Sequence, residues 1–598
     1  MVSPVTPSSG VLAPLGLDSV RISPGFWADR DARVVIDHAW EWAERVGWIG
    51  NFRGEPRRGR EFSDSEIYKL LEAMAWSGHH GFDELAQTVA RAQEADGYLN
   101  TKWSGDRYAD FEWGHELYCY GHLIQAGVAR LRAHGEDTLT EVVRRAADHV
   151  CARFMDSGEV CGHPEIEMAL VELYRATGTE RYLEMARRFV ERRGRPALAD
   201  IELGREYFQD DVPVRQAESL RGHAVRAVYL ACAQVDLAVE TGDKELLRAT
   251  EAQWEHALAR RTYITGGIGS RHAGEAFGED FELPPDRAYV ETCAGVGSVM
   301  LAHRLLLATG DVCYADHAER VLYNVIAASP AADLRTFFYS NPLQVRTPGE
   351  VVDGVNPRAE SALRAPWFSV SCCPNNLART FASLAAYVAT HDDGGVQVHH
   401  LTPAEIRHNG LTLRVETGYP WSGGVTVRVV ESAGGPSRIA LRVPRWADGA
   451  RLDGRRVAPG YAQVEGEWQA GDEIRLDLPV EPRWTRPDPR IDAVRGCVAV
   501  ERGPLVYCAE AVGDDPPLLE IEVDTSGNPV EIDSGRELEV AAHRHAAVDA
   551  AWPYGMGEQA REGEDAGSLR LMPYHRWGNR GPATMRVWLP EIPPPPLG

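Results

Sequence analysis

The sequence predicts a multidomain chain in which an (α/α)6 barrel is followed by two antiparallel β-sandwich domains. Apolar residues recur at spacings of three and four from about residue 30 to about 390. A glycine corner recurs within this part, and from about Gly395 the apolar period changes to two. We expect an N-terminal extension with a short strand (1–30), a barrel (31–392), a β-sandwich (393–485) and a second β-sandwich with a proline-rich tail (486–598).

The helical part contains a repeated corner. A helix ends at a glycine, a short polar stretch follows, and a bulky apolar residue stands four positions after the glycine. Such a glycine closes one helix, and the apolar residue packs the start of the next. The repeat predicts five or six helical hairpins, in an open solenoid or in a closed ring with a concave mouth, and the ring suits this length better. The copies are Gly78 with Phe82, Gly135 with Leu139, Gly178 with Tyr182, Gly242 with Leu246, and Gly310 with Tyr314.

The second part of the chain alternates apolar and polar residues, as in Val425, Val427 and Val429. This pattern is typical of antiparallel sheet with one exposed face, and sandwiches are the expected arrangement. The proline-rich stretch 481–490 indicates a break between two β modules. Residues 18–27 resemble a short strand that packs on the β part, and residues 593–596 are expected to be extended and poorly ordered.

Composition excludes several classes of protein. The chain has 598 residues, of which 44% are hydrophobic and 25% charged, and its net charge is −25. This charge argues against non-specific binding to nucleic acid or to anionic membranes. We find no apolar run of about 18 residues that would predict a membrane-spanning helix. Residues 1–17 lack the basic and apolar segments of a secretory signal, so a cytoplasmic location is expected.

Ten cysteines are too few for a disulfide scaffold. Three of them occur in two short motifs, Glu291-Thr-Cys293 and Ser-Cys372-Cys373-Pro374. Pro374 fits a first helical turn, which predicts Cys373 at the N-cap, where a thiol pKa is lowered. Three thiolates and one carboxylate make a four-coordinate zinc set, although three buried thiols or a closed structural zinc remain possible interpretations. The other seven are expected to be small buried apolar side chains: Cys119, Cys151, Cys161, Cys232, Cys313, Cys497 and Cys508.

Three histidines stand at or near expected helix starts, namely His115, His163 and His223. Equivalent positions in successive hairpins would face one mouth of a ring, where imidazoles suit hydrogen bonding to a sugar; satisfied structural histidines are the alternative. The loop Gly266-Gly-Ile-Gly-Ser, which is no dinucleotide motif, is expected to bring Glu275 into the site as a general acid, unless Glu275 is simply exposed. Tyr339 is either a core aromatic or a polar contact at the mouth.

These motifs, taken together, resemble glycoside hydrolase family 127, the β-L-arabinofuranosidases. The resemblance rests on His-Glu-Leu-Tyr at 115, Gly-His-Pro-Glu-Ile-Glu at 162, Gly-His-Ala-Val-Arg at 222, Glu-Thr-Cys at 291, Ser-Cys-Cys-Pro-Asn-Asn-Leu-Ala-Arg at 371 and Glu-Arg-Gly-Pro-Leu-Val-Tyr at 501. It runs along nearly the whole chain in the same order. It implies an (α/α)6 barrel followed by two β-sandwich domains.

The resemblance also implies roles for single residues. The zinc ligands would be Glu291, Cys293, Cys372 and Cys373, with Cys372 as nucleophile and Glu275 as general acid/base. The sugar contacts would be His115, His163, His223 and Tyr339. A retaining exo-glycosidase acting on terminal β-L-arabinofuranose in small oligosaccharides or glycosides is therefore expected, with a homodimer possible by the family's habit. The alternatives are action on another furanoside, such as a branched acidic pectin sugar, or a non-hydrolytic carbohydrate-binding barrel with a structural zinc.

Overall fold

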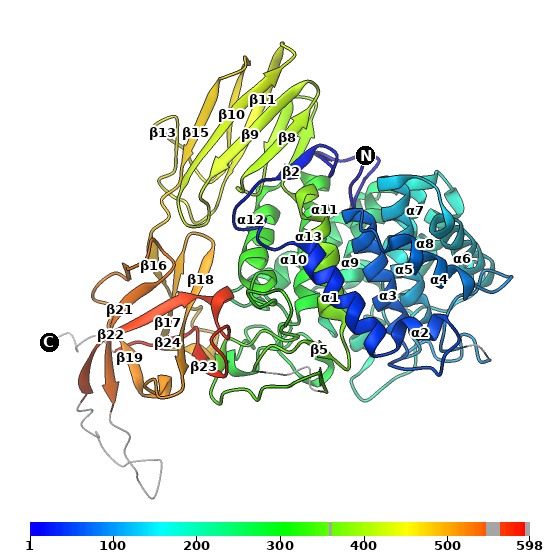
Figure 1. Ribbon diagram of the computed structural model, residues 1–598, viewed down its shortest axis with the longest axis horizontal. Coiled ribbons are helices and arrows are strands. Elements are labelled where there is room, and N and C mark those ends of the chain that lie inside the picture. The colour runs from blue at the N-terminus through cyan, green and yellow to red at the C-terminus, as the bar shows by residue number, and fades with distance from the viewer. Residues whose placement is uncertain (104, 358–361, 546–562, 593–598) are drawn as a thin grey trace, which may run out of the picture.

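The computed structural model describes residues 1–103, 105–357, 362–545 and 563–592. A helical domain packs against two β-rich domains that follow it in the chain (Figure 1). The predicted extended end, 593–596, lies outside the described residues.

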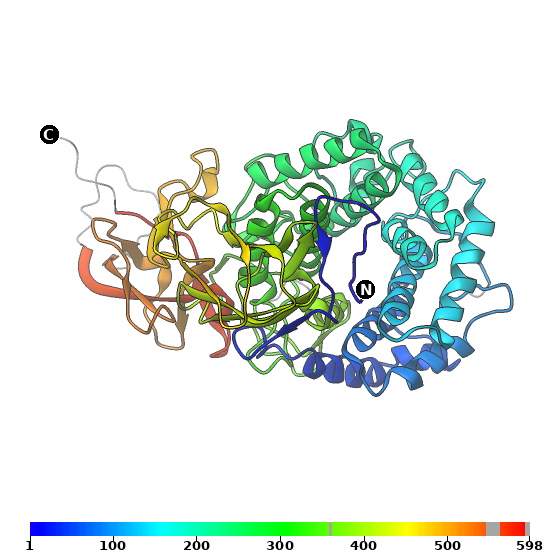
Figure 2. The same cartoon turned by 90° about the horizontal axis from the view of Figure 1, so that it is seen from above.

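Six helices form a closed ring, in which each contacts the next and the last, α13, contacts the first, α3 (Figure 2). Each is buried around most of its circumference, as in α11, where residues 292–307 are all buried. A helix with neighbours on every side needs apolar residues on every side, which explains why the amphipathic pattern is weak here. The inner helices are α3 (Ser63–Ser77), α5 (Glu116–His134), α7 (Ile166–Thr177), α9 (Ala224–Thr241), α11 (Thr292–Thr309) and α13 (Cys372–Ser383).

Each inner helix packs against an outer helix. The five predicted glycines end α3, α5, α7, α9 and α11, all with positive φ, and the apolar residues that follow are buried in the first turns of the next helices. The sixth pair joins α13 to α1, which lie far apart in sequence, and this pairing closes the ring. The outer helices are α1 (Ala32–Arg45), α4 (Phe82–Arg91), α6 (Thr138–Phe154), α8 (Glu180–Arg192), α10 (Lys244–Arg260) and α12 (Val312–Val321); the short α2 (Trp48–Phe52) packs on α3 and α4.

The N-terminal segment covers one end of the ring. Arg132, near the end of α5, donates hydrogen bonds to the carbonyl oxygens of Ser3 and Pro4 at 3.1 and 3.2 Å. The carbonyl oxygen of Leu307, near the end of α11, accepts from the backbone of Val11 and of Leu12. This segment therefore lies over the C-terminal ends of the inner helices, and the N-terminal ends face the opposite mouth.

Helix α11 differs from the sequence prediction in one respect. By length and composition it could cross a membrane, with a mean hydropathy of 1.3, although the sequence analysis found no such apolar run. It is 83% buried inside the ring, which is the expected environment of an apolar core helix.

Two of the seven cysteines that were predicted to be buried differ from that prediction. Cys313 is exposed at the start of α12, and Cys497 is half-buried; the other five are buried.

The middle domain consists of two sheets, and the N-terminal extension adds one strand to each. The strand Val20–Ile22 pairs with β8, and the shorter β1 pairs with β6. One pair, β7 with β11, is parallel, contrary to the purely antiparallel expectation, because β11 returns to the first sheet after β8 to β10 have entered the other. The first sheet contains β1 (Ala13–Pro14), β6 (Ala389–Asp392), β7 (Gly395–Val398), β11 (Pro436–Val443) and β14 (Gly460–Glu467). The second contains β2 (Val20–Ile22), β8 (Ala404–His408), β9 (Leu411–Thr417), β10 (Gly424–Ser432), β12 (Arg451–Leu452), β13 (Arg455–Arg456) and β15 (Glu473–Asp477).

The C-terminal domain is one branched sheet instead of two separate ones. Strand β18 changes partner along its length, from β17 to β22 to β23, which links all parts of the sheet. Strand β16 pairs with β17, so the domain begins by Pro482, before the predicted boundary at 485. The strands are β16 (Pro482–Thr485), β17 (Cys497–Arg502), β18 (Leu505–Val512), β19 (Ile521–Val523), β20 (Val530–Glu531), β21 (Leu538–His545), β22 (Gly563–Pro573), β23 (Ala583–Arg586) and β24 (Leu589–Pro590), with β3 (Gln344–Val345) added from the helical domain; β4 (Val355–Asn356) and β5 (Trp367–Phe368) form a separate small pair.

A buried ion pair joins the middle domain to the ring. Arg442 of β11 is fully buried and donates to Asp316 of α12 at 2.6 Å and to Glu319. Glu319 also accepts from the hydroxyl of Tyr419 at 2.7 Å. Because these charges are shielded from water, each depends on its partner.

We expect the substitution Arg442→Ala to destabilise the protein by about 3–5 kcal/mol, because it leaves the Glu319 carboxylate buried without a cation. The matched control is Arg428→Ala, which breaks an exposed pair with Glu473 in the same domain and costs less than about 1 kcal/mol. Thermal unfolding followed by circular dichroism compares the two. Equal melting temperatures in the two variants would contradict the importance of the buried pair.

Candidate metal centre and active site

The N-terminal ends of the inner helices meet at the open mouth of the ring. His115, His223 and Glu291 directly precede α5, α9 and α11, and Ser371 precedes α13. His163 lies shortly before α7. Because helix N-termini carry partial positive charge, this mouth favours anionic groups.

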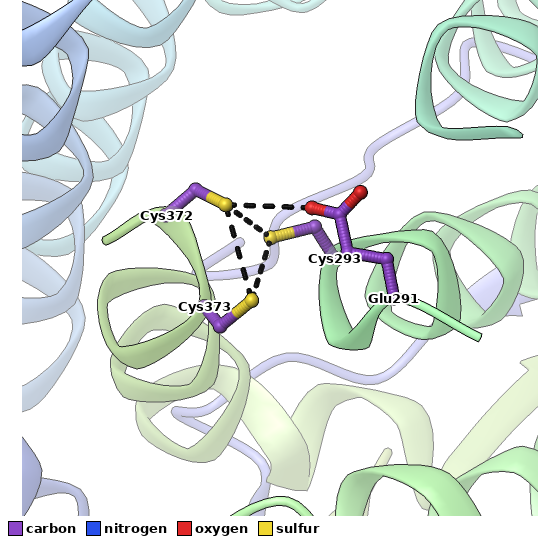
Figure 3. A group of neighbouring side chains, drawn as sticks. All are labelled: Glu291, Cys293, Cys372 and Cys373. Carbon is purple, nitrogen blue, oxygen red and sulfur yellow. Dashed lines mark hydrogen bonds between the residues drawn. The ribbon is translucent and has the colours of Figure 1, made fainter. Parts of the chain in front are cut away.

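Glu291, Cys293, Cys372 and Cys373 form one buried cluster between α11 and α13 (Figure 3). The Cys293 sulfur lies 3.1 Å from that of Cys372 and 3.5 Å from that of Cys373, and the two adjacent sulfurs are 3.9 Å apart. Disulfide sulfurs would be about 2.05 Å apart. Bonds of about 2.3 Å to a tetrahedral zinc ion place sulfur ligands about 3.8 Å apart, so the cluster fits a four-coordinate metal ion.

The helix start at this cluster differs from the prediction. Ser371 is the N-cap of α13, so Cys372 and Cys373 are its first two residues and Pro374 the third. Proline is tolerated throughout a first helical turn, because the N–H it lacks would have no helical partner there, and so Pro374 alone does not define the cap. Cys293 is likewise the second residue of α11.

Burial determines the electrostatics of the cluster. It raises the pKa of all three thiols well above the ordinary value and that of Glu291 to about 8. Without a cation, these groups would therefore hold their protons. Since a bound metal ion reverses this preference, the donor set of three sulfurs and one carboxylate oxygen is one that needs a metal in order to ionise.

Glu275 lies in the short helical turn Ala273–Glu275 of the loop between α10 and α11, with a positive φ. Its carboxylate accepts a hydrogen bond from the hydroxyl of Tyr289 at 2.8 Å and from the imidazole of His223 at 3.1 Å. Burial is the largest single influence and raises the pKa of Glu275, but the interactions with His223, Tyr289 and Arg226 together outweigh it, so the pKa is lowered. The ligand atoms of His223, Glu275 and Glu291 also lie within 4.8 Å of one another.

The three predicted histidines form a row along the mouth. The ring centroids of His115 and His163 are 5.8 Å apart, and those of His163 and His223 are 5.7 Å apart. Burial lowers the pKa of all three, and that of His115 to about 3, so they are neutral imidazoles that can both donate and accept hydrogen bonds. The hydroxyl of Tyr339 lies 3.5 Å from the sulfur of Cys372.

All the site residues predicted from the sequence, except Cys373, line one cavity of about 390 Å³. The sequence analysis did not select several other lining residues, among them Trp113, Tyr118, Tyr207 and Arg226. Tyr118 and Arg226 each follow a predicted histidine by three residues, one helical turn, and this spacing could have revealed them. Trp113 carried no such signal.

Comparisons with known proteins find similarity along nearly the whole chain. The sequence model described as "Beta-L-arabinofuranosidase, GH127 catalytic domain" matches residues 17–386, and those of the GH127 middle and C-terminal domains match residues 395–480 and 482–590. A "Non-reducing end beta-L-arabinofuranosidase" from Bifidobacterium longum subsp. longum is 35% identical, covering 89% of each chain. The crystal structure of a GH127 β-L-arabinofuranosidase from Geobacillus stearothermophilus T6 is 33% identical, with a TM-score of 0.87 over 96% of this chain and 100% of that one. A structure described as a GH127 β-arabinofuranosidase is 31% identical, with a TM-score of 0.86 over 98% of each chain.

We expect the protein to bind about one metal ion per chain and the substitution Cys293→Ser to weaken that binding by more than about 10-fold, because its thiolate would be a direct ligand. Metal content after dialysis against a chelator, measured by mass spectrometry, checks this. Cys313→Ser, which changes an exposed thiol outside the cluster, is the control and should keep its metal. Equal metal retention in both variants would show that the cluster is not the binding site.

Proposed function

The chain belongs to glycoside hydrolase family 127, and on this premise we propose that it is an exo-acting β-L-arabinofuranosidase that retains the anomeric configuration. The activity of the 35% identical relative supports the choice of sugar. The closed ring of six inner helices supports an (α/α)6 barrel as the catalytic domain. Its far end is covered by the N-terminal segment, so the cavity is a pocket, which suits release of a single terminal sugar.

The observation that carries the proposal is the position of Cys372. Of the three clustered thiols it has the largest exposed fraction, 8%, against 2% for Cys293 and none for Cys373, and it lines the cavity. Cys293 also lines the cavity, but Cys372 is the more exposed residue and therefore the more accessible to a bound sugar. We assign it as the nucleophile as well as a metal ligand, and the other two cysteines as ligands only.

A zinc ion held by Glu291, Cys293, Cys372 and Cys373 would supply the positive charge that keeps their thiols deprotonated at neutral pH. Cysteine is an intrinsically strong nucleophile once it is ionised, and its task here is the one a carboxylate performs in most retaining glycosidases.

In the first step the sulfur of Cys372 attacks the anomeric carbon. A carbon–sulfur bond forms, the glycosidic carbon–oxygen bond breaks, and Glu275 donates a proton to the departing oxygen. Since His223 and Tyr289 favour the carboxylate form of Glu275, the carboxyl group has to take up its proton before this step.

In the second step the carboxylate of Glu275 accepts a proton from water. The water oxygen attacks the anomeric carbon, the carbon–sulfur bond breaks, and the electron pair returns to the sulfur of Cys372. Two inversions give net retention. His115, His163, His223 and Tyr339 line the cavity, and we assign them to hydrogen-bond the sugar hydroxyls and hold the ring during both steps.

We expect the purified protein to release L-arabinose from an aryl β-L-arabinofuranoside, with the β-anomer of the product appearing first in a proton NMR time course. Cys372→Ser should lose this activity and keep its fold, as judged by circular dichroism. Appearance of the α-anomer first would contradict retention. If folded, metal-loaded protein releases no L-arabinose, the proposed sugar is wrong and another furanoside becomes the favoured substrate.

We expect Glu275→Gln to lower kcat by about 10²–10⁴-fold, because the amide can neither donate nor accept the proton. The loss should be smaller for substrates whose leaving group needs no protonation, and azide should restore part of the second step by replacing water. Glu279→Gln, which changes an exposed carboxylate four residues away in the same loop, should behave as wild type. A uniform loss for all leaving groups, without rescue by azide, would assign Glu275 a structural role.

A further inference from the structure

A second cavity, of about 660 Å³, lies where the helical domain meets both β-rich domains. Its walls come from the segment between β2 and α1, the residues after α12, the turn between β9 and β10, and the C-terminal domain. We call it the junction cavity and define it by Arg30, Trp421, Arg536, His575 and Arg576. The proposed reaction uses none of these residues.

One wall of the junction cavity is aromatic. The ring centroids of Trp421 and His575 are 6.0 Å apart, and Phe26 lies 6.2 Å from Trp421 and 5.2 Å from His575. These three rings come from three different parts of the chain and meet only in the folded protein. An aromatic face of this kind can pack against the apolar C–H surface of a sugar ring.

Three guanidinium groups surround this wall. Arg30 lies 4.0 Å from the centroid of the Phe26 ring, and Arg536 lies 5.7 Å from that of Trp421. Arg576 donates to the carbonyl oxygen of Arg536 at 3.3 Å. Within the described part of the chain none of the three forms an ion pair with a carboxylate, whereas the fourth arginine of the cavity, Arg580, is paired with Glu510 at 2.6 Å.

Two carboxylates, Asp29 and Glu537, also line the cavity, so its three unpaired arginines exceed these acids by one, in a chain whose net charge is −25. Burial lowers the pKa of Arg30 to about 10, and its Nε atom is buried without a hydrogen-bond partner. His575 is only 7% exposed, and its Nδ1 atom also lacks a partner among the described residues. Burial, with Arg30 and Arg576 beside it, holds the pKa of His575 well below the ordinary value. Arg536 and Arg576 are exposed, so Arg30 is the cation that pays for burial; the neighbouring Asp29 offsets only part of this cost, because the pKa of Arg30 is still lowered.

We propose that the junction cavity is a second ligand site and that its ligand is a small sugar acid. The carboxylate would lie among Arg30, Arg536 and Arg576, since guanidinium groups bind carboxylates through paired hydrogen bonds. The sugar ring would pack against Trp421. The assignment to an oxyanion follows from the charges alone, and the sugar portion rests also on the proposed function.

Titration calorimetry at low salt tests this with three ligands on the full-length protein. D-Glucuronate and D-glucose differ by a carboxylate in place of a hydroxymethyl group, and inorganic phosphate is a bare oxyanion. We expect glucuronate to bind at least about 10-fold more tightly than glucose and more tightly than phosphate. Trp421→Ala, Arg536→Gln and Arg576→Gln should each weaken glucuronate binding by about 10-fold.

Arg428→Gln is the matched control, because it removes one cation from an exposed pair outside the cavity and should leave glucuronate binding unchanged. Glu275→Gln should also leave it unchanged, which separates this site from the active site and makes the test independent of turnover. Absence of glucuronate binding, or binding that survives the three cavity variants, would overturn the proposal. Phosphate binding equal to that of glucuronate and unaffected by Trp421→Ala would overturn the sugar assignment.

Discussion

Four acidic side chains meet in one buried cluster, and the charge they carry when ionised governs the arrangement of the mouth around them. Burial alone keeps Glu291 and the three thiols protonated. Ionisation therefore depends on cationic surroundings, which the N-termini of α11 and α13 begin to supply. Lys69 of α3, fully buried and 2.8 Å from Glu66, adds a fixed positive charge nearby, and its pKa is raised by Glu66, Cys372 and Cys293 against the effect of burial.

The C-terminal domain supports this mouth through the segment that carries Tyr339. Tyr339 lies in the long segment between α12 and α13, and the backbone N–H of Thr292 donates to its carbonyl oxygen at 2.9 Å. The neighbouring Phe338 stacks on Trp577 of the C-terminal domain, and β3 from the same segment pairs with β23. The buried guanidinium of Arg364 donates to the carbonyl oxygen of Trp577 at 2.8 Å. A segment with little regular structure is thus held in place by a neighbouring domain, which keeps Tyr339 beside Cys372.

Much of the fold was predictable because local chemistry specifies it. Gly178 and Gly310 end their helices in the left-handed conformation that glycine adopts most readily, so the corners are readable without tertiary information. The alternation of Val425, Val427 and Val429 in β10 likewise reports one buried face. Closure of the ring was harder to predict from the sequence, because it depends on contacts between α13 and the distant α1 and α3. The parallel pairing of β7 with β11 depends on chain path and left no local signal.

In the candidate site, too, some features are predictable from local sequence and others depend on tertiary contacts. The sequence by itself determined the candidate side chains of the site: the cysteine pair at 372 and 373, the Glu-Thr-Cys stretch at 291, and the histidines at helix starts. Tertiary structure alone decided that Cys372 faces the cavity while Cys373 is sealed from it, and that Glu275 meets His223 and Tyr289. It also brought Arg30, Trp421 and Arg576 together at the junction cavity. The physical reason is that residue type and helix caps act over a few positions, whereas exposure and charge pairing depend on side chains that only folding makes neighbours.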